Sequence, residues 1–255
     1  MAKENTQIIN TQETLADTSA ESNAALDGVT YSLSFLNNST QTGFACIYQQ
    51  DPNITDPDVM SLAWFSKGSY PETKITFAWQ INYNFVWAQA GLLVPGVIFT
   101  ASESPAADLS TTNQITLLYD QDLSSYTFDK QESGAESGTL YITEDSSIPS
   151  KSIDPAAVGI GMAGFGTFVK QATPNWNLNF TPKPEYWITF GNYCQGEVMD
   201  ISSISNSAQI SFPPGVYSMA AVLNADNTWT VSPASQASKA FAAVSGSKPL
   251  LNGKS

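Results

Sequence analysis

The stretch Asn175-Trp-Asn-Leu-Asn-Phe180 alternates polar and apolar side chains without a break. Successive side chains of a β-strand point to opposite faces of the sheet, so this alternation predicts a strand with one buried face. Tyr31-Ser-Leu-Ser-Phe35 and Ile75-Thr-Phe-Ala-Trp79 repeat the pattern. No window between the two ends of the chain keeps the 3.6-residue period of an amphipathic helix. The sequence therefore predicts an all-β protein.

Further runs of β-branched and aromatic residues extend this prediction outward along the chain. Turn residues recur about every eight to twelve positions, which is typical of sandwiches and barrels. The segment 223–231 predicts a hairpin with a short polar turn. We expect one antiparallel β-sandwich domain, jelly-roll-like, with extended N- and C-terminal arms. The remaining strands are expected at 44–49, 83–89, 114–119, 125–128, 138–143, 165–171, 186–190, 208–212 and 215–223.

The two ends of the chain differ from the middle. Residues 1–28 are rich in Thr, Gln, Asn, Ala, Ser and Glu, and residues 233–255 are rich in Ser, Ala and Lys. Such segments bury too little apolar surface to fold alone. We therefore predict a polar arm over 1–28, a sandwich domain over 29–232 and a tail over 233–255.

The N-terminal arm contains one segment suited to strand exchange. An extended segment can pair with a sheet edge through its backbone, whatever its side chains. The edge would belong either to the same domain or to a neighbouring subunit. The candidate self-association residues are Thr6, Ile8, Ile9 and Thr11.

Histidine and arginine do not occur in the 255 residues, which narrows the chemistry open to the protein. Histidine is the usual base of serine-type triads and the commonest transition-metal ligand, and arginine is the bidentate clamp for phosphate. Paired carboxylates still permit a glycosidase. Its best candidate is Glu185, beside two aromatic residues, with Glu197 or Glu72 as the second carboxylate. We nevertheless expect no catalytic residue and no cofactor, because solvated turns account for most Asp and Glu.

The acidic and weakly charged composition restricts the partners. Net charge is −13 and the ten lysines are spread singly, so no basic patch exists for nucleic acid or an anionic membrane. The longest apolar run, 91–99, is too short to span a bilayer and contains Pro95. We expect no nucleic-acid partner and no membrane insertion. A homo-oligomer or polymer is the expected assembly, and a neutral glycan is a possible ligand.

Two features bear on the compartment. The N-terminus, Met1-Ala-Lys-Glu-Asn-Thr-Gln7, lacks the apolar segment of a classical signal peptide, so we expect a cytoplasmic protein or leaderless export. Cys46 and Cys194 lie far apart and form no CxxC pair. We favour two buried thiols over a long-range disulfide, and the geometry decides between them.

Two motifs resemble ligand sites, and each also has a structural interpretation. Gly159-Ile-Gly-Met-Ala-Gly164 contains G-x-G-x-x-G, but a strand pattern follows where a dinucleotide site needs a helix. Close sheet packing is the preferred interpretation. Asp51, Asp56 and Asp58 offer oxygen ligands for a weak calcium site. The EF-hand pattern fails because Asp56 stands where it needs glycine, so Pro/Asp turns are the simpler interpretation.

The tryptophans supply a second group of candidates. Trp64 and Trp87 lie in dense aromatic runs, whereas the other four lie in ordinary strand patterns. Because neighbouring strand residues face opposite ways, one of Trp64 and Phe65 should point away from the first core. It would meet a second layer, a subunit or a sugar. Trp64 and Trp87 are therefore the candidate ligand-binding residues, although burial is the default for tryptophan.

Several strings in the chain are long enough to carry a family resemblance. They are Tyr31-Ser-Leu-Ser-Phe-Leu-Asn-Asn-Ser39, Cys46-Ile-Tyr-Gln-Gln-Asp-Pro52, Val59-Met-Ser-Leu-Ala-Trp-Phe65, Tyr83-Asn-Phe-Val-Trp87, Val158-Gly-Ile-Gly-Met162, Tyr186-Trp-Ile188 and Phe212-Pro-Pro-Gly-Val-Tyr-Ser218. Over about 30–232 the chain thereby resembles the RhiA family, named for a bacterial protein expressed in the rhizosphere. The resemblance implies an abundant, soluble, quorum-regulated protein of plant–microbe life, and it brings no catalytic residues. Both ends lie outside the resembling region.

These observations favour a non-enzymatic protein. We expect a structural or self-assembling β-sandwich that forms oligomers or filaments through neutral polar surfaces. The alternative is a carbohydrate- or surface-binding module in plant–microbe interaction. A carboxylate-based glycosidase ranks third.

Overall fold

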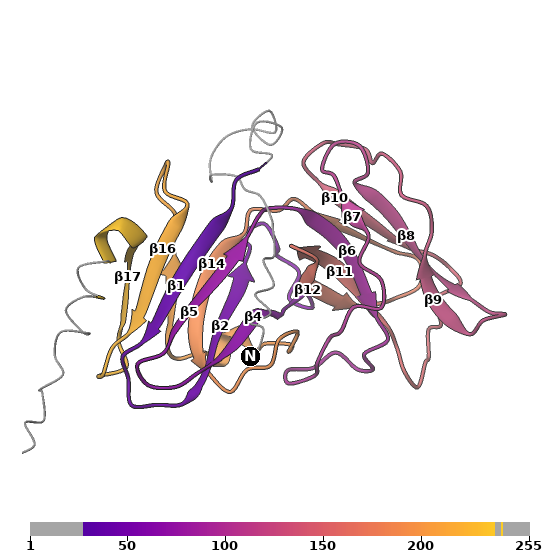
Figure 1. Ribbon diagram of the computed structural model, residues 1–255. Coiled ribbons are helices and arrows are strands. Elements are labelled where there is room, and N and C mark those ends of the chain that lie inside the picture. The colour runs from indigo at the N-terminus through magenta and orange to yellow at the C-terminus, as the bar shows by residue number, and fades with distance from the viewer. Residues whose placement is uncertain (1–27, 238–240, 242–255) are drawn as a thin grey trace, which may run out of the picture.

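The computed structural model describes residues 28–237 and 241, and these residues form an all-β molecule (Figure 1). Its strands form four sheets, which we name A to D. Sheet A has the order β17-β16-β1-β5 and sheet B the order β15-β14-β2-β4. Their strands are β1 (Tyr31–Asn37), β2 (Gly43–Gln50), β4 (Ala63–Ser69), β5 (Lys74–Trp79), β14 (Glu185–Gly191), β15 (Ser207–Ile210), β16 (Ser218–Leu223) and β17 (Trp229–Pro233).

Sheets C and D are formed by the middle of the chain. Sheet C has the order β3-β12-β11-β6-β7, and sheet D has the order β13-β10-β8-β9. Most neighbouring strands are antiparallel, whereas β1 with β16 and β8 with β10 are parallel. The strands are β3 (Met60–Ser61), β6 (Tyr83–Ala88), β7 (Ala106–Ala107), β8 (Gln114–Asp120), β9 (Ser125–Phe128), β10 (Leu140–Glu144), β11 (Ala157–Met162), β12 (Phe165–Gln171) and β13 (Trp176–Phe180).

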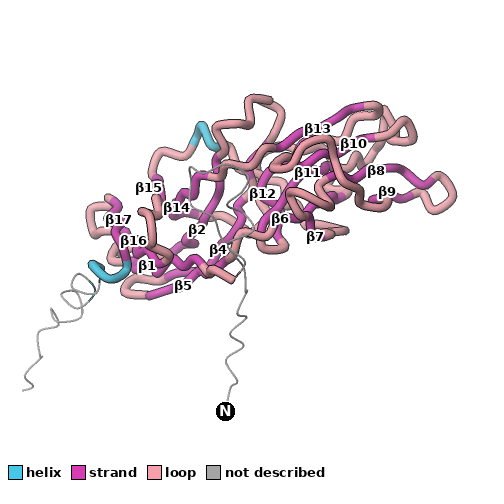
Figure 2. Tube along the Cα trace, turned by 90° about the horizontal axis from the view of Figure 1, so that it is seen from above, coloured by secondary structure: helices cyan, strands magenta, loops and turns pink. Residues whose placement is uncertain are grey.

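The sheets pack face to face in two pairs, as a β-sandwich requires. Between sheets A and B, the ring centroids of Trp79 and Trp64 lie 5.4 Å apart. Between sheets C and D, the Phe85 and Phe128 rings lie 6.4 Å apart. Figures 1 and 2 show the two pairs side by side along an elongated molecule.

One hydrophobic cluster runs through both sheet pairs. Trp64 of sheet B donates its indole N–H to the carbonyl oxygen of Met162 in sheet C, at 2.9 Å. The rings of Phe65 and Phe165 lie 5.7 Å apart across the same boundary. Residues 60–69 cross from β3 in sheet C to β4 in sheet B. Both sheet pairs therefore share a core.

A β-bulge corrects the predicted orientation of Trp64 and Phe65. Ile47 pairs with Phe65 and Tyr48 pairs with Ala63, so Trp64 is the extra residue of β4. Such an extra residue interrupts the alternation of faces. Trp64 and Phe65 are both buried in the same cluster, with ring centroids 4.1 Å apart. Neither of them points away from the core.

The glycine motif at 159–164 is structural, as the sequence predicts. Strands β11 and β12 form a hairpin, and Ala163 and Gly164 both have positive φ in its turn. A β-carbon at Gly159 would lie 2.0 Å from the Phe168 carbonyl oxygen, and one at Gly161 would lie 2.2 Å from that of Phe165. The glycines permit close backbone packing and open no helix.

The predicted strands all occur, with ends shifted by a few residues. The predicted hairpin forms from β16 and β17. The sequence patterns miss four strands: β3 and β7, which have two residues each, β4, which is bulged, and β11, which is buried on both faces. No helix within residues 28–237 and 241 has the length and apolar character needed to cross a membrane. The proposed pairing of Thr6, Ile8, Ile9 and Thr11 lies outside the described residues.

Candidate functional site: the polar end of sheets C and D

Glu144 occupies a core position in sheet D. Leu140, Ile142 and Glu144 alternate along β10 and share its inward face, and all three are buried. Glu144 is 1% exposed. A charged side chain at such a depth is rare unless it is paired. The carboxylate therefore marks this end of the sandwich as different from the rest of the core.

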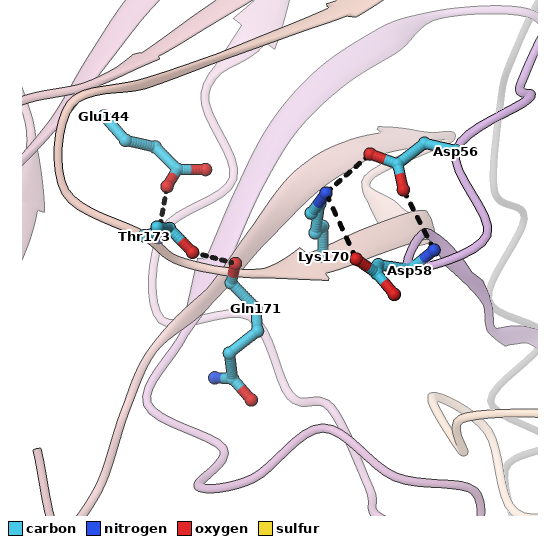
Figure 3. A network of polar contacts seen from close by, with 6 residues as sticks. All are labelled: Asp56, Asp58, Glu144, Lys170, Gln171 and Thr173. Atoms are coloured by element: carbon cyan, nitrogen blue, oxygen red, sulfur yellow. Dashed lines mark hydrogen bonds and ion pairs between the residues drawn. The ribbon is translucent and has the colours of Figure 1, made fainter. Parts of the chain in front are cut away.

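The hydrogen bonding of Glu144 is incomplete. Its Oε2 atom accepts the backbone N–H of Thr173 (Figure 3). Its Oε1 atom is buried and has no hydrogen-bond partner among the described residues. Burial raises the pKa of Glu144 to about 7, although the Thr173 N–H and the charge of Lys170 both act to lower it. At neutral pH the carboxyl group is therefore divided between its neutral and ionised forms.

Lys170, on strand β12 of sheet C, supplies the positive charge of this cluster. It lies opposite Val158, a core residue of β11, so its side chain starts on the inward face. That side chain is 10% exposed. Its Nζ lies 2.5 Å from Asp56 Oδ2 and 3.7 Å from Asp58 Oδ2 (Figure 3). The hydrogen bond from Lys170 lowers the pKa of Asp56.

Trp176 completes the cluster at the surface. It pairs with Glu144 across β10 and β13. Its side chain is on the same face as the buried Leu178 and Phe180, but it lies at the end of the strand and is 48% exposed. Lys170 Nζ lies 5.3 Å from the centroid of its ring, within the range of a cation–π interaction. The indole is thus held in place and still open to solvent.

Strand β13 is also an open sheet edge. It is the outermost strand of sheet D, and β10 is its sole strand neighbour within the described residues. Asn177 and Asn179 are exposed on its outer face. The strand contains no proline, lysine or bulge, which are the usual features that prevent edge pairing. It presents a neutral backbone edge five residues long.

The other edges of the described sheets are short, bent or covered. Strands β3 and β7 have two residues each. On β9, the Glu103 carboxylate accepts hydrogen bonds from Thr127 Oγ1 and the Phe128 N–H. On β5, the Thr76 carbonyl accepts Lys67 Nζ at 2.8 Å. Strand β4 carries the bulge, and β15 lies beside β17. These features protect edges from pairing with another chain. Strand β13 differs from the other edge strands because it is longer than two residues and carries no bulge, proline or lysine.

The structure corrects the predicted aromatic ligand site. Trp64 is 0% exposed and Trp87 is 5% exposed. Trp64 is covered by sheet C, and Trp87 packs against Tyr126 of sheet D with ring centroids 6.0 Å apart. Both rings are therefore covered by protein, as in the second-layer alternative, and not by a subunit or a sugar. Trp176 is instead the exposed indole.

The aspartates of the predicted calcium site have other partners. Asp56 and Asp58 face Lys170, a cation that competes with a metal. Asp51 accepts the N–H groups of Asn53 and Lys183, and burial raises its pKa. Within the described residues no three His, Cys, Asp or Glu side chains are grouped for a metal ion. The calcium interpretation is therefore wrong for this arrangement.

Two of the proposed glycosidase carboxylates, Glu185 and Glu72, are not brought together as a pair. Glu185 begins β14 opposite Gln50, at one end of sheet B. Glu72 follows Ser69, which lies beside Gly43 at the other end of β2. Seven residues of strand separate these ends by about 20 Å, beyond the reach of a catalytic pair. Glu197 instead accepts the N–H of Cys194 in its own turn.

The two cysteines are free thiols, so the disulfide alternative is wrong. Cys46 is buried, as expected, and burial raises the pKa of its thiol. Cys194 is exposed, contrary to the prediction of two buried thiols.

Two central residues of this cluster, Glu144 and Lys170, were not among the candidates predicted from the sequence. Glu144 extends the alternation of Leu140 and Ile142 by one inward position, and this signal could have identified a buried carboxylate. Lys170 ends a similar run in β12. The electrostatic effect of Lys170 on Glu144 depends on the packing of sheets C and D, which no local pattern predicts.

Comparisons with known proteins place the chain in a family. The RhiA family model matches residues 28–234, which include every residue of this cluster. The chain belongs to the RhiA family. It is 37% identical over 214 residues to the protein RhiA of Rhizobium leguminosarum bv. viciae, covering 83% of this chain and 90% of that protein. No solved structure matches the chain. The RhiA name states no activity, so function has to be argued from the structure.

Proposed function

We propose that this RhiA-family protein is a non-enzymatic structural protein that self-associates through the outer edge of β13. The observation that carries the proposal is the contrast between this neutral edge, which has no second strand neighbour among the described residues, and the protected edges of the other sheets. Unpaired backbone groups on an edge strand are a template for pairing with another chain. A chain without histidine or arginine, and with few charges, is suited to such a role.

The partner in this proposal is the β13 strand of a second copy. An antiparallel pair centred on Leu178 is related by a twofold axis, the commonest symmetry of protein dimers. In this register Trp176 of each copy lies opposite Phe180 of the other. Asn177 lies opposite Asn179 in the same way. Aromatic cross-strand pairs stabilise antiparallel sheets, so the sequence of β13 suits this register.

Charge substitutions at the two asparagines test the interface. In Asn177→Lys/Asn179→Lys, like charges oppose each other twice in the twofold pair. We expect association to weaken roughly tenfold or more, because like charges directly opposite destabilise strand pairs. In Asn177→Lys/Asn179→Asp, opposite charges face each other and association should be retained. Size-exclusion chromatography with light scattering and electron microscopy would measure the particles.

A control separates the edge from general effects of charge. Ser32→Lys/Ser34→Lys adds the same charge to β1, an interior strand of sheet A, and should leave particle size unchanged. Deleting residues 2–28 tests whether the N-terminal arm forms the interface instead. A wild-type protein that stays monomeric at high concentration would contradict the proposal. So would equal assembly of both β13 double variants.

Binding of a neutral glycan is a second candidate, and the exposed Trp176 indole favours it. Aromatic faces beside polar groups suit the apolar faces and hydroxyl groups of sugars, and Asp56 and Asp58 lie beside the same lysine. Trp176→Ala should remove binding on a glycan array. Tyr70→Ala, which removes an exposed ring elsewhere, should not. No binding by the wild-type protein would exclude this candidate.

A further inference from the structure

The buried carboxyl group of Glu144 lies directly beside the open edge. Glu144 and Trp176 are register partners, so the strand that carries the carboxyl group also holds the first residue of β13. We infer that protonation of Glu144 controls whether β13 can pair with a second copy. This inference rests on the proposed self-association and adds its regulation.

The geometry suits the neutral form of Glu144. One oxygen has a single backbone N–H donor, and the other has none among the described residues. A neutral carboxyl group leaves one buried O–H without an acceptor in such a site, which costs less than a buried charge. An ionised one leaves a buried charge with one hydrogen bond, which is strongly unfavourable. Ionisation must therefore draw in a cation or water, or move this end of β10.

The charged groups near Glu144 come from two elements, and a third element contributes an apolar residue. Lys170 extends from β12, and Asp56 and Asp58 come from the segment between β2 and β3. In β8, the residue paired with Glu144 is the apolar Leu117. Ionised Glu144 would add a third carboxylate around one ammonium group.

Any movement of Lys170 toward Glu144 also affects Trp176. The ammonium group lies 5.3 Å from the centroid of the Trp176 ring and forms its cation–π contact. When Lys170 turns to Glu144, the indole loses that contact and the first residue of β13 is less firmly held. An edge strand pairs with another chain more readily when it is already held in an extended conformation. Ordering a loosely held strand costs free energy and so opposes association. Ionisation of Glu144 should therefore weaken assembly.

The direction of the pH effect follows from the pKa of about 7. Below pH 6 Glu144 is neutral and β13 is held for pairing, whereas above pH 8 it is ionised. Histidine is absent from the chain, so it cannot supply a transition in this range. We expect assembly below neutral pH and its loss above, with a midpoint near 7.

The first experiment measures particle size by light scattering between pH 5.5 and 8.5. Wild-type protein should dissociate as the pH rises, with a decrease in apparent association constant of at least tenfold. Glu144→Gln keeps the shape and removes the charge, so it should stay assembled throughout. Glu136→Gln makes the same substitution at an exposed position and should behave like wild type. A Glu144→Gln protein that dissociates like wild type would overturn the inference.

The second experiment observes the switch without assembly. Fluorotryptophan is incorporated into the Asn177→Lys/Asn179→Lys variant for fluorine NMR. The Trp176 resonance is assigned as the signal that disappears when Trp176→Phe is added. This resonance should titrate with a midpoint near pH 7, and Glu144→Gln should abolish the titration. Lys170→Met removes the cation that lowers the pKa of Glu144, so it should move the midpoint upward.

The outcomes distinguish the two proposals. A resonance that does not titrate between pH 5.5 and 8.5 overturns the control by Glu144, even if the protein assembles. A titrating resonance in a protein that never assembles overturns the self-association and, with it, the regulation of assembly. Assembly that is independent of pH while Trp176 titrates overturns the coupling alone.

Discussion

At the residue scale, Glu144 follows the alternation of β10 in its orientation but is a carboxylate where that pattern expects an apolar side chain. The alternation of Leu140, Ile142 and Glu144 places the carboxylate inside the sandwich, because side chains two apart share a face. Sequence could thus predict its orientation. The sequence could not predict that Oε1 lacks a hydrogen-bond partner or that Lys170 pairs with Asp56. Both depend on the packing of the opposite sheet.

Glu144 should make stability depend on pH. Its folded pKa of about 7 is above the ordinary value of 4.5, so its contribution is fully present below pH 4.5 and is lost as pH rises through 7. The shift corresponds to an upper bound of roughly 3 kcal/mol. Glu144→Gln should therefore raise the free energy of unfolding relative to wild type more at pH 8.5 than at pH 5. Urea unfolding of an edge-blocked variant at both pH values would measure this, and an equal effect at both would contradict it.

At the element scale, alternation predicted the strands with one buried face, whereas β4 and β11 were missed; β6, buried along its whole length, was predicted without alternation. β13 alternates cleanly because its outer face meets solvent. β11 is buried along its whole length, and β4 is interrupted at Trp64 by the bulge. In both strands a second layer removes the requirement for polar residues on the outer face, so the period of two disappears from the sequence.

The β11–β12 hairpin makes a prediction at this scale. In Gly161→Ala the new β-carbon would lie 2.2 Å from the Phe165 carbonyl oxygen, so the strands must move apart. We expect a loss of roughly 2 to 4 kcal/mol of unfolding free energy, in the range of strained core substitutions. Gly68→Ala is the control, because its β-carbon would meet Phe44 at an ordinary 3.8 Å. Thermal and urea unfolding would compare them, and equal stabilities would contradict the packing argument.

At the scale of the whole molecule, the sheet edges decide what the protein can do with its neighbours. Sheets A and B lie close at both of their sides, where β4 meets β5 and β15 meets β17. Sheets C and D meet at one side through Glu103, which bridges from beside Trp87 to β9. The β13 side carries the polar cluster and the open edge. Electron microscopy should therefore show dimers or larger assemblies joined along the β13 side of sheets C and D (Figure 2).

The sequence by itself determined the fold class, most strands, the structural role of the glycine motif and the lack of imidazole and guanidinium chemistry. These follow from local alternation, turn residues and composition, which need no knowledge of distant contacts. Tertiary structure alone decided which tryptophan is exposed, which aspartates face Lys170 and which edge is open. Burial and pairing depend on segments far apart in the chain. Trp64 is covered by residues about a hundred positions away, and Lys170 meets an aspartate at a similar separation.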